Sequence, residues 1–306
     1  MNIYPVPIPN NLFQPLANHW LPANGGRVII STCEGVDYLY LDGECRLVHS
    51  LSHEKKGRNK KDQGNELLFD LINVVQEPAQ WQDLASSVPP DRLISWCETY
   101  GMLLRDEVMP DGSEGVRLAV AQIEVLTLYL IFSLWQSIML PPAQTQDLEA
   151  QEQQERSRLI GLLFLRCIGP KKPVKSKAGH WEISLDILNP AHLLHAAARE
   201  LDQKRQCLLL KCFIQDILGQ RLNGLTPDLS LIHPRPQFLM RAECPLTVAY
   251  WQLANLMLKP DEKRRYHVCP CGRSFYGHAT RKYCSQCDRR TAYSRRARSR
   301  SSGQGR

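Results

Sequence analysis

The chain has 306 residues, of which 43% are hydrophobic and 23% are charged, as is ordinary for a globular protein. This composition excludes a collagen-like or largely disordered chain, and the length favours about two domains. The net charge of +7 is unevenly distributed: residues 259–306 hold 14 Lys and Arg against 3 Asp and Glu, a net +11, whereas residues 1–258 carry −4. A mildly acidic body joined to a strongly basic end indicates an acidic polymer or surface as partner.

The cysteines indicate a reducing compartment. Of 11 cysteines, 7 are scattered and 4 are grouped between residues 269 and 287. The first seven residues lack the basic region and following apolar run of a signal peptide. We therefore expect a cytoplasmic protein with reduced thiols.

Strand character dominates the first predicted domain, residues 1–64. Three short runs at 27–31, 37–41 and 45–49 are rich in β-branched and aromatic residues, and the turn pairs Glu34-Gly35 and Asp42-Gly43 separate them. The simplest prediction is a small antiparallel meander. The basic stretch 54–64 that follows is either a solvated loop or a contributor to nucleic-acid binding.

The apolar spacing becomes helical at about residue 65 and stays so to about 260, which defines the second predicted domain. We expect a loop at 226–236, and helices at about 65–75, 90–101, 116–140, 144–168, 190–223 and 245–258. The fold class predicted is therefore mainly α: a multi-helix body with a small N-terminal antiparallel β element and a C-terminal zinc knuckle followed by a basic helix.

The apolar stretch 116–140 raises the question of a membrane span. Its uncharged core, Val125 to Leu140, has only 16 residues, whereas a spanning helix needs about 20. A helix buried in a protein core is the better interpretation, so we expect no membrane association.

Four cysteines form the strongest motif, C-x-C-x12-C-x2-C, made by Cys269, Cys271, Cys284 and Cys287. Four thiolates close a tetrahedral site, which selects zinc or iron–sulfur over hard cations. Structural Zn²⁺ is the predicted cofactor, with His267 or His278 as possible replacements for one cysteine. A disulfide pair is disfavoured by the expected compartment, and a catalytic zinc would need an open position and a nearby base.

An arginine-rich run follows the last cysteine directly. A helix through it would align Arg289, Tyr293, Arg296 and Arg300 on one face. Arginines with an interleaved tyrosine suit phosphates and exposed bases, so the run favours contact with nucleic acid; a solvated basic tail is the alternative.

These motifs resemble a known family. Residues 271–275 (Cys-Gly-Arg-x-Phe) and 281–287 (Arg-Lys-Tyr-Cys-Ser-x-Cys), followed by arginines, resemble the C-terminal treble-clef-like zinc finger of bacterial CGNR-type proteins. The resemblance covers about 266–298 and, more weakly, the helical pattern of about 65–105. The first cysteine pair is narrower than in that family, and the tetrapeptide that gives the family its name is here Cys287-Asp288-Arg289-Arg290. The resemblance implies a helical ABATE-like body, a finger at 261–306 and a nucleic-acid-binding role.

The resulting hypothesis is a zinc-stabilised nucleic-acid-binding protein, with DNA favoured over RNA by the resemblance, and with a possible homodimer through the helical body. The candidate nucleic-acid contacts are Arg281, Lys282, Arg289, Arg290, Tyr293, Arg295, Arg296, Arg298 and Arg300. The alternatives are an RNA-binding protein and a protein-interaction module whose structural zinc docks a basic end on an acidic partner. The sequence contains no G-x-S-x-G, Walker-type or G-x-G-x2-G motif, so nothing in it argues for an enzyme.

Overall fold

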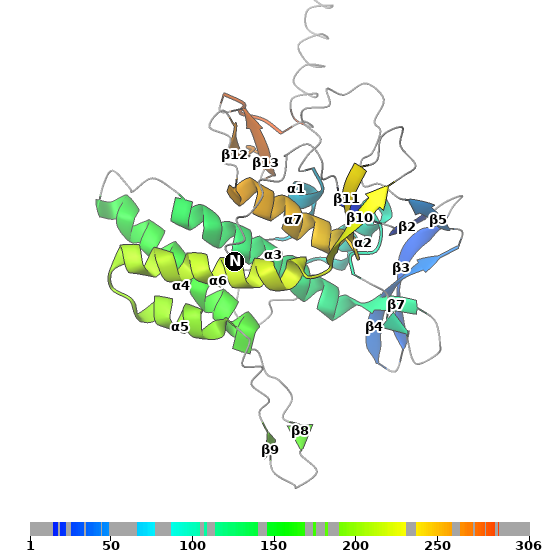
Figure 1. The fold of residues 1–306 in the computed structure, drawn as a ribbon, viewed down its shortest axis with the longest axis horizontal. Helices are drawn as coiled ribbons and strands as arrows, with labels where there is room; N and C mark the ends of the chain where they lie inside the picture. Colours follow the sequence, from blue (N-terminus) through cyan, green and yellow to red (C-terminus); the bar gives the residue numbers. More distant parts are fainter. Residues whose placement is uncertain are drawn as a thin grey trace, which may run out of the picture.

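A computed structural model of the chain describes the following residues: 15–17, 19–22, 26–33, 35–43, 45–48, 66–76, 87–104, 107–108, 114–139, 146–168, 174–175, 181–182, 190–230, 237–258, 264–271, 273–278, 280–284 and 287. This part of the chain is mainly helical, as predicted, with small sheets at its periphery (Figure 1).

Seven helices lie within the described residues: α1 Glu66–Ile72, α2 Pro90–Tyr100, α3 Leu118–Met139, α4 Gln146–Ile168, α5 Ala191–Arg199, α6 Gln203–Leu222 and α7 Pro245–Leu258. Helices α3, α4, α5 and α6 pack side by side, and α7 packs against both α6 and α1 (Figure 1). One continuous hydrophobic core runs through all seven helices and reaches Val28 and Leu39 of the N-terminal sheet.

Proline and glycine set several helix ends where the sequence predicts them. Pro90 lies in the first turn of α2, where its missing N–H costs nothing. Gly101 ends the same helix with φ 92°, a left-handed conformation that favours glycine. Pro245 opens α7 in the same way as Pro90 opens α2.

The long apolar helix α3 is a core helix of the body. It is long and apolar enough to cross a membrane by length and composition alone, but 67% of its most apolar window is buried inside the protein. Arg221 of α6 contacts the buried Glu124 of α3 at 2.7 Å, and Arg156 of α4 donates from Nη2 to the carbonyl oxygen of Ser137 at 2.9 Å. These contacts suit a helix packed against protein, and the expected absence of membrane association stays a prediction.

The region predicted as one long helix from Pro190 to about residue 223 is two helices, so that prediction was wrong. Asp202 interrupts it because its side chain caps α6, accepting from the backbone N–H groups of Lys204 and Arg205. Leu201 lies in the break and is 99% exposed. An aspartate at an N-cap competes with helix continuation, and the apolar periodicity on either side conceals this.

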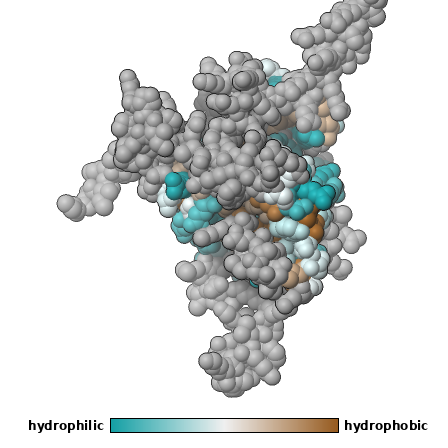
Figure 2. All heavy atoms as spheres, turned by 90° about the vertical axis from the view of Figure 1, so that its right-hand side faces the viewer, coloured by the Kyte–Doolittle hydropathy of each residue, from teal (hydrophilic) through white to brown (hydrophobic). Residues whose placement is uncertain are grey.

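An antiparallel N-terminal sheet forms as predicted. Strands β3 Arg27–Cys33 and β4 Val36–Asp42 pair through a turn at Gly35, and β7 Glu114–Arg117 and β6 Glu107–Val108 extend the sheet in the order β3-β4-β7-β6. The third predicted run, β5 Cys45–Val48, pairs instead with β2 His19–Pro22, so the strands do not form a simple meander. Figure 2 shows the face of the molecule that lies on the right-hand side of Figure 1. On this face, hydrophobic and hydrophilic residues of the described part of the chain lie next to one another.

The segment predicted as a loop at 226–236 begins as a strand, which corrects the prediction. Strand β10 Leu225–Ser230 pairs with β11 Gln237–Ala242, and β1 Pro15–Ala17 adds to β11 in parallel. A short antiparallel pair, β8 Val174–Lys175 and β9 Trp181–Glu182, lies between α4 and α5 in the sequence. The pairing of β1 with β11 joins segments more than 200 residues apart, a relation that local sequence does not encode.

The last two strands, β12 Arg264–Val268 and β13 Ser274–His278, form a hairpin that we call, together with the residues up to Cys287, the finger (residues 264–287). Strand β13 contacts α1, so the finger rests on the helical body (Figure 1). The predicted basic helix after the finger lies outside the described residues, and the predicted domain boundaries near residues 64 and 260 stay predictions.

Candidate metal centre

A tight hairpin turn brings the first two cysteines together. Strands β12 and β13 pair with Tyr266 opposite Tyr276, and the backbone N–H of Cys269 donates to the carbonyl oxygen of Arg273 at 2.8 Å. This bond closes the turn that contains Pro270 and Cys271. The thiols of Cys269 and Cys271 therefore both lie at this turn, with only Pro270 between them in the sequence.

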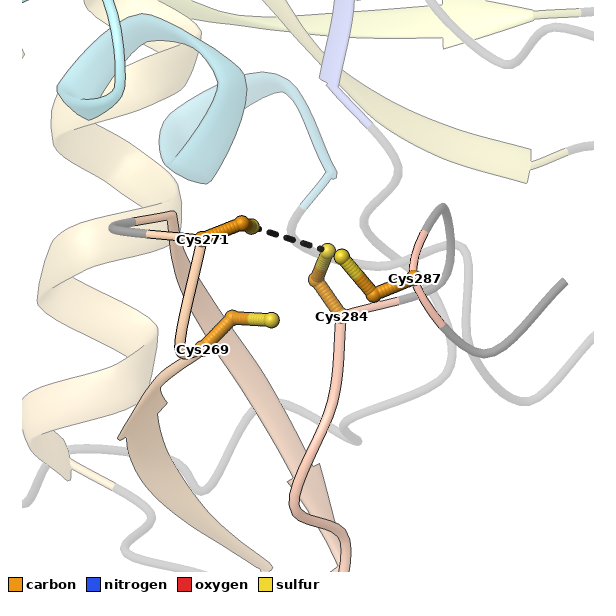
Figure 3. Close-up of side chains that lie close together, drawn as sticks. All are labelled: Cys269, Cys271, Cys284 and Cys287. Carbon is orange, nitrogen blue, oxygen red and sulfur yellow. Dashed lines mark hydrogen bonds between the residues drawn. The ribbon is translucent and has the colours of Figure 1, made fainter. Parts of the chain in front are cut away.

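The segment after β13 returns the second cysteine pair to this turn. The sulfur atoms of Cys269, Cys271, Cys284 and Cys287 all lie within 4.8 Å of one another, and those of Cys271 and Cys284 are 3.8 Å apart. The four side chains point toward one another (Figure 3). This group could hold a metal ion, and it contains all four cysteines that the spacing predicted as ligands.

The sulfur cluster is partly sheltered. Cys269 and Cys284 are 2% and 5% exposed and pack with Phe275, while Cys287 is half-buried and Cys271 is exposed. Phe275 covers one side of the cluster with apolar carbon. A metal here would be held by the protein on that side and would meet solvent near Cys271.

Hydrogen bonds among the thiols shift their pKa values. Burial alone would raise the pKa of Cys269, but hydrogen bonds from the backbone of Cys271 and Cys284 and from neighbouring thiols lower it to about 6. Hydrogen bonding with Cys271, Cys269 and Cys284 raises the pKa of Cys287 to about 12. At neutral pH the cluster therefore contains a stabilised thiolate, which is the form that binds metals.

Histidine is not needed to complete the group. The imidazole of His267 stacks on the ring of Phe275, with centroids 5.2 Å apart and an interplanar angle of 22°, and the sulfur group forms without it. The side chain of His278, the other candidate, lies outside the described side chains.

Arg281, which the sequence predicts as a nucleic-acid contact, also makes contacts within the finger, and its contact with nucleic acid stays a prediction. Its guanidinium carbon lies 5.7 Å from the centroid of Phe275, and its Nε donates to the carbonyl oxygen of Tyr283 at 3.2 Å. Gly277 leaves the space for this arrangement: a Cβ there would meet Cδ of Arg281 at 3.1 Å and Cε2 of Phe275 at 3.3 Å. Arg281 thus ties the segment before Cys284 to the hairpin.

The remaining predicted nucleic-acid contacts divide into two groups. Lys282 is exposed on the finger. The others lie outside the described residues: Arg289, Arg290, Tyr293, Arg295, Arg296, Arg298 and Arg300. The structure also exposes Arg273 and Tyr283 beside the cysteines, two residues that the prediction did not select. The available signal was their closeness to candidate ligands in the sequence: Tyr283 precedes Cys284 directly, and Arg273 follows Cys271 by two residues.

Comparisons with protein-family models, curated proteins and solved structures find no match for this chain.

Proposed function

We propose that the finger holds a structural Zn²⁺ and binds nucleic acid, with DNA as the favoured ligand, as in the CGNR-type proteins that the sequence resembles. The observation that carries the proposal is the combination of a four-sulfur cluster with a uniformly basic chain around it. Residues 264–287 contain Arg264, Arg265, Arg273, Arg281 and Lys282, and no Asp or Glu.

The distances between the sulfurs support a tetrahedral metal. Tetrahedral zinc with Zn–S bonds of about 2.3 Å requires sulfurs about 3.8 Å apart. The separation between Cys271 and Cys284 is 3.8 Å, and the whole group stays within 4.8 Å. Four protein ligands leave no open position, which is typical of a structural rather than a catalytic zinc.

The metal would supply the folding energy of the finger. Among the described residues of the finger, the buried hydrophobic ones are Cys269, Phe275 and Cys284. Such a small cluster cannot order a chain of this length, so binding free energy would become folding free energy. The role of the metal in this proposal is to hold the basic side chains in one arrangement.

Metal analysis tests the first half of the proposal. We expect about one zinc per chain in the purified protein, a large loss in Cys284→Ser, and no loss in the matched control Cys212→Ser, whose exposed cysteine lies on α6. Iron in place of zinc would show a different metal in the same site. Equal, near-zero metal in all three proteins would contradict the proposal.

A salt titration tests the second half. Neutralising about five phosphates gives a slope near −4.5 in log affinity against log salt for duplex DNA. Deleting residues 288–306 removes the predicted contacts Arg289, Arg290, Arg295, Arg296, Arg298 and Arg300 and leaves the basic residues of 264–287, so this slope should become flatter. Absence of binding to both DNA and RNA at low salt would reject nucleic acid and favour the alternative, a protein-interaction module that docks on an acidic partner.

Three further expectations accompany the proposal: a regulatory role, a cytoplasmic location and a homodimer through the helical body. Gel filtration combined with light scattering measures the last directly.

A further inference from the structure

Tyr283 has an unusual position on the finger. It lies between Lys282, which is exposed, and Cys284, which is 5% exposed and belongs to the sulfur cluster. Tyr283 is 39% exposed, and it is the only aromatic residue among the exposed large hydrophobic residues in the described part of the chain. An aromatic ring is therefore presented to solvent directly beside the candidate metal centre.

The backbone of Tyr283 is fixed on both sides. On one side, its carbonyl oxygen accepts the 3.2 Å hydrogen bond from Nε of Arg281, whose guanidinium lies over Phe275. On the other side, the next residue is Cys284, whose sulfur lies 3.8 Å from that of Cys271. An aromatic side chain on a fixed backbone loses little conformational entropy when a flat ligand stacks on it.

The charge around this ring suits an anionic ligand. Lys282 and Arg273 are exposed, and the sequence from 264 to 287 has no acidic residue. Proteins that bind single-stranded nucleic acid combine positive charge along the backbone with aromatic side chains on which bases stack. In a duplex the faces of the bases are already stacked on one another, so an exposed ring gains nothing from them except at an end.

We propose that Tyr283 is a stacking platform for an unpaired base, so that the finger binds single-stranded DNA in preference to duplex. This inference rests on the proposed function, because it names the kind of nucleic acid that the finger takes. Arg281 acts here as a positioning residue: it holds the carbonyl of Tyr283, while Lys282 and Arg273 neutralise the neighbouring phosphates.

The expected effect follows from measured stacking energies. Loss of one base–aromatic stack weakens binding by about 5- to 150-fold, which corresponds to about 1–3 kcal/mol. Tyr283→Ala should show this loss, and Tyr283→Phe, which keeps the ring, should bind within about twofold of the unchanged protein. Tyr283→Leu keeps an apolar side chain without the aromatic face and should behave like Tyr283→Ala.

The experiment uses the zinc-loaded full chain at one fixed salt concentration. Fluorescence anisotropy measures affinity for a labelled oligothymidine of about 15 nucleotides, for a duplex of the same length, and for a strand of abasic sites with the same phosphates. Tyr283→Ala should lose affinity for oligothymidine alone. On the abasic strand it should equal the unchanged protein, because no base is present to stack.

Either of two results with Tyr283→Ala would overturn the inference: an affinity for oligothymidine equal to that of the unchanged protein, or an equal loss on the abasic strand. Binding of the unchanged protein to duplex alone would also reject it, while leaving the proposed function intact. Failure to bind any of the three probes would instead reject the proposed function. Metal content is measured for each variant; if Tyr283→Ala releases zinc, Tyr283→Leu decides the outcome.

Discussion

Replacing Arg281 by glutamine should weaken zinc binding without touching a ligand. Arg281 makes two contacts that join the halves of the finger: the cation–π contact at 5.7 Å with Phe275 and the hydrogen bond at 3.2 Å to the carbonyl oxygen of Tyr283. Phe275 lies on β13, which follows the first cysteine pair, and Tyr283 directly precedes Cys284. Because folding of the finger is proposed to depend on the metal, these contacts form together with metal binding, and their loss weakens the complex more than the metal-free chain.

The size of the effect follows from these contacts. A partly exposed cation–π contact stabilises by about 0.5–1 kcal/mol. A hydrogen bond from a charged donor contributes about 1.5–3 kcal/mol, and the lower end applies because Arg281 is half-buried. The sum is about 2 kcal/mol, and because folding of the finger and metal binding are coupled, zinc affinity should fall about 30-fold.

Competition against a coloured zinc chelator at neutral pH measures this affinity. The matched control is Lys282→Gln, which removes the same charge from the neighbouring, exposed position. Zinc affinity should be unchanged in the control, while its salt slope for DNA falls by about one. Equal zinc affinity of Arg281→Gln and Lys282→Gln would refute this prediction. An equal loss would mean that charge is responsible, and no loss in either would mean that the contacts of Arg281 contribute nothing.

Three other predictions concern the helical body. Oε1 of Gln252 accepts from the buried backbone N–H of Leu68 at 2.9 Å, so Gln252→Leu should lower the free energy of unfolding by about 1–3 kcal/mol in a urea titration. Asp202→Ala removes the N-cap of α6 and should cost about 0.5–2 kcal/mol in the same assay, whereas an unchanged midpoint would mean that the cap contributes nothing. Burial raises the pKa of Cys97 to about 12 from an ordinary value near 9, so iodoacetamide at pH 8 should modify the exposed Cys212 in the native protein and Cys97 only after unfolding. Because the folded state binds this proton more tightly than the unfolded state, the associated stability is present below pH 9 and is lost as the pH rises toward 12; urea titrations of the unchanged protein and Cys97→Ala at pH 8 and 10 measure the difference.

Helix positions were largely predictable because their signals are local. Pro90 and Gly101 bound α2, Pro245 opens α7, and the apolar run of α3 matches its buried length. Strand partners were not predictable in the same way. The pairing of β5 with β2 depends on contacts between segments that the sequence separates by more than 20 residues, and periodicity says nothing about such contacts.

The candidate site shows the same division. The spacing of the four cysteines was enough to predict that they form one group. The role of Arg281 was not predictable, because its contact with Phe275 depends on the hairpin register and on the space beside Gly277. A basic residue near a cysteine in the sequence is compatible both with a phosphate contact and with contacts inside the finger, and the fold shows the second for Arg281.

Helix α1 has a consequence for how the molecule unfolds. Its N-terminal turn is held by Gln252 of α7, its buried residues belong to the main core, and it also contacts β13 of the finger. The finger therefore contacts a helix whose burial the body needs, and we expect the stabilities of the two parts to be coupled. If the proposed metal holds the finger, removing it with a chelator should lower the melting temperature of the helical body as well as that of the finger.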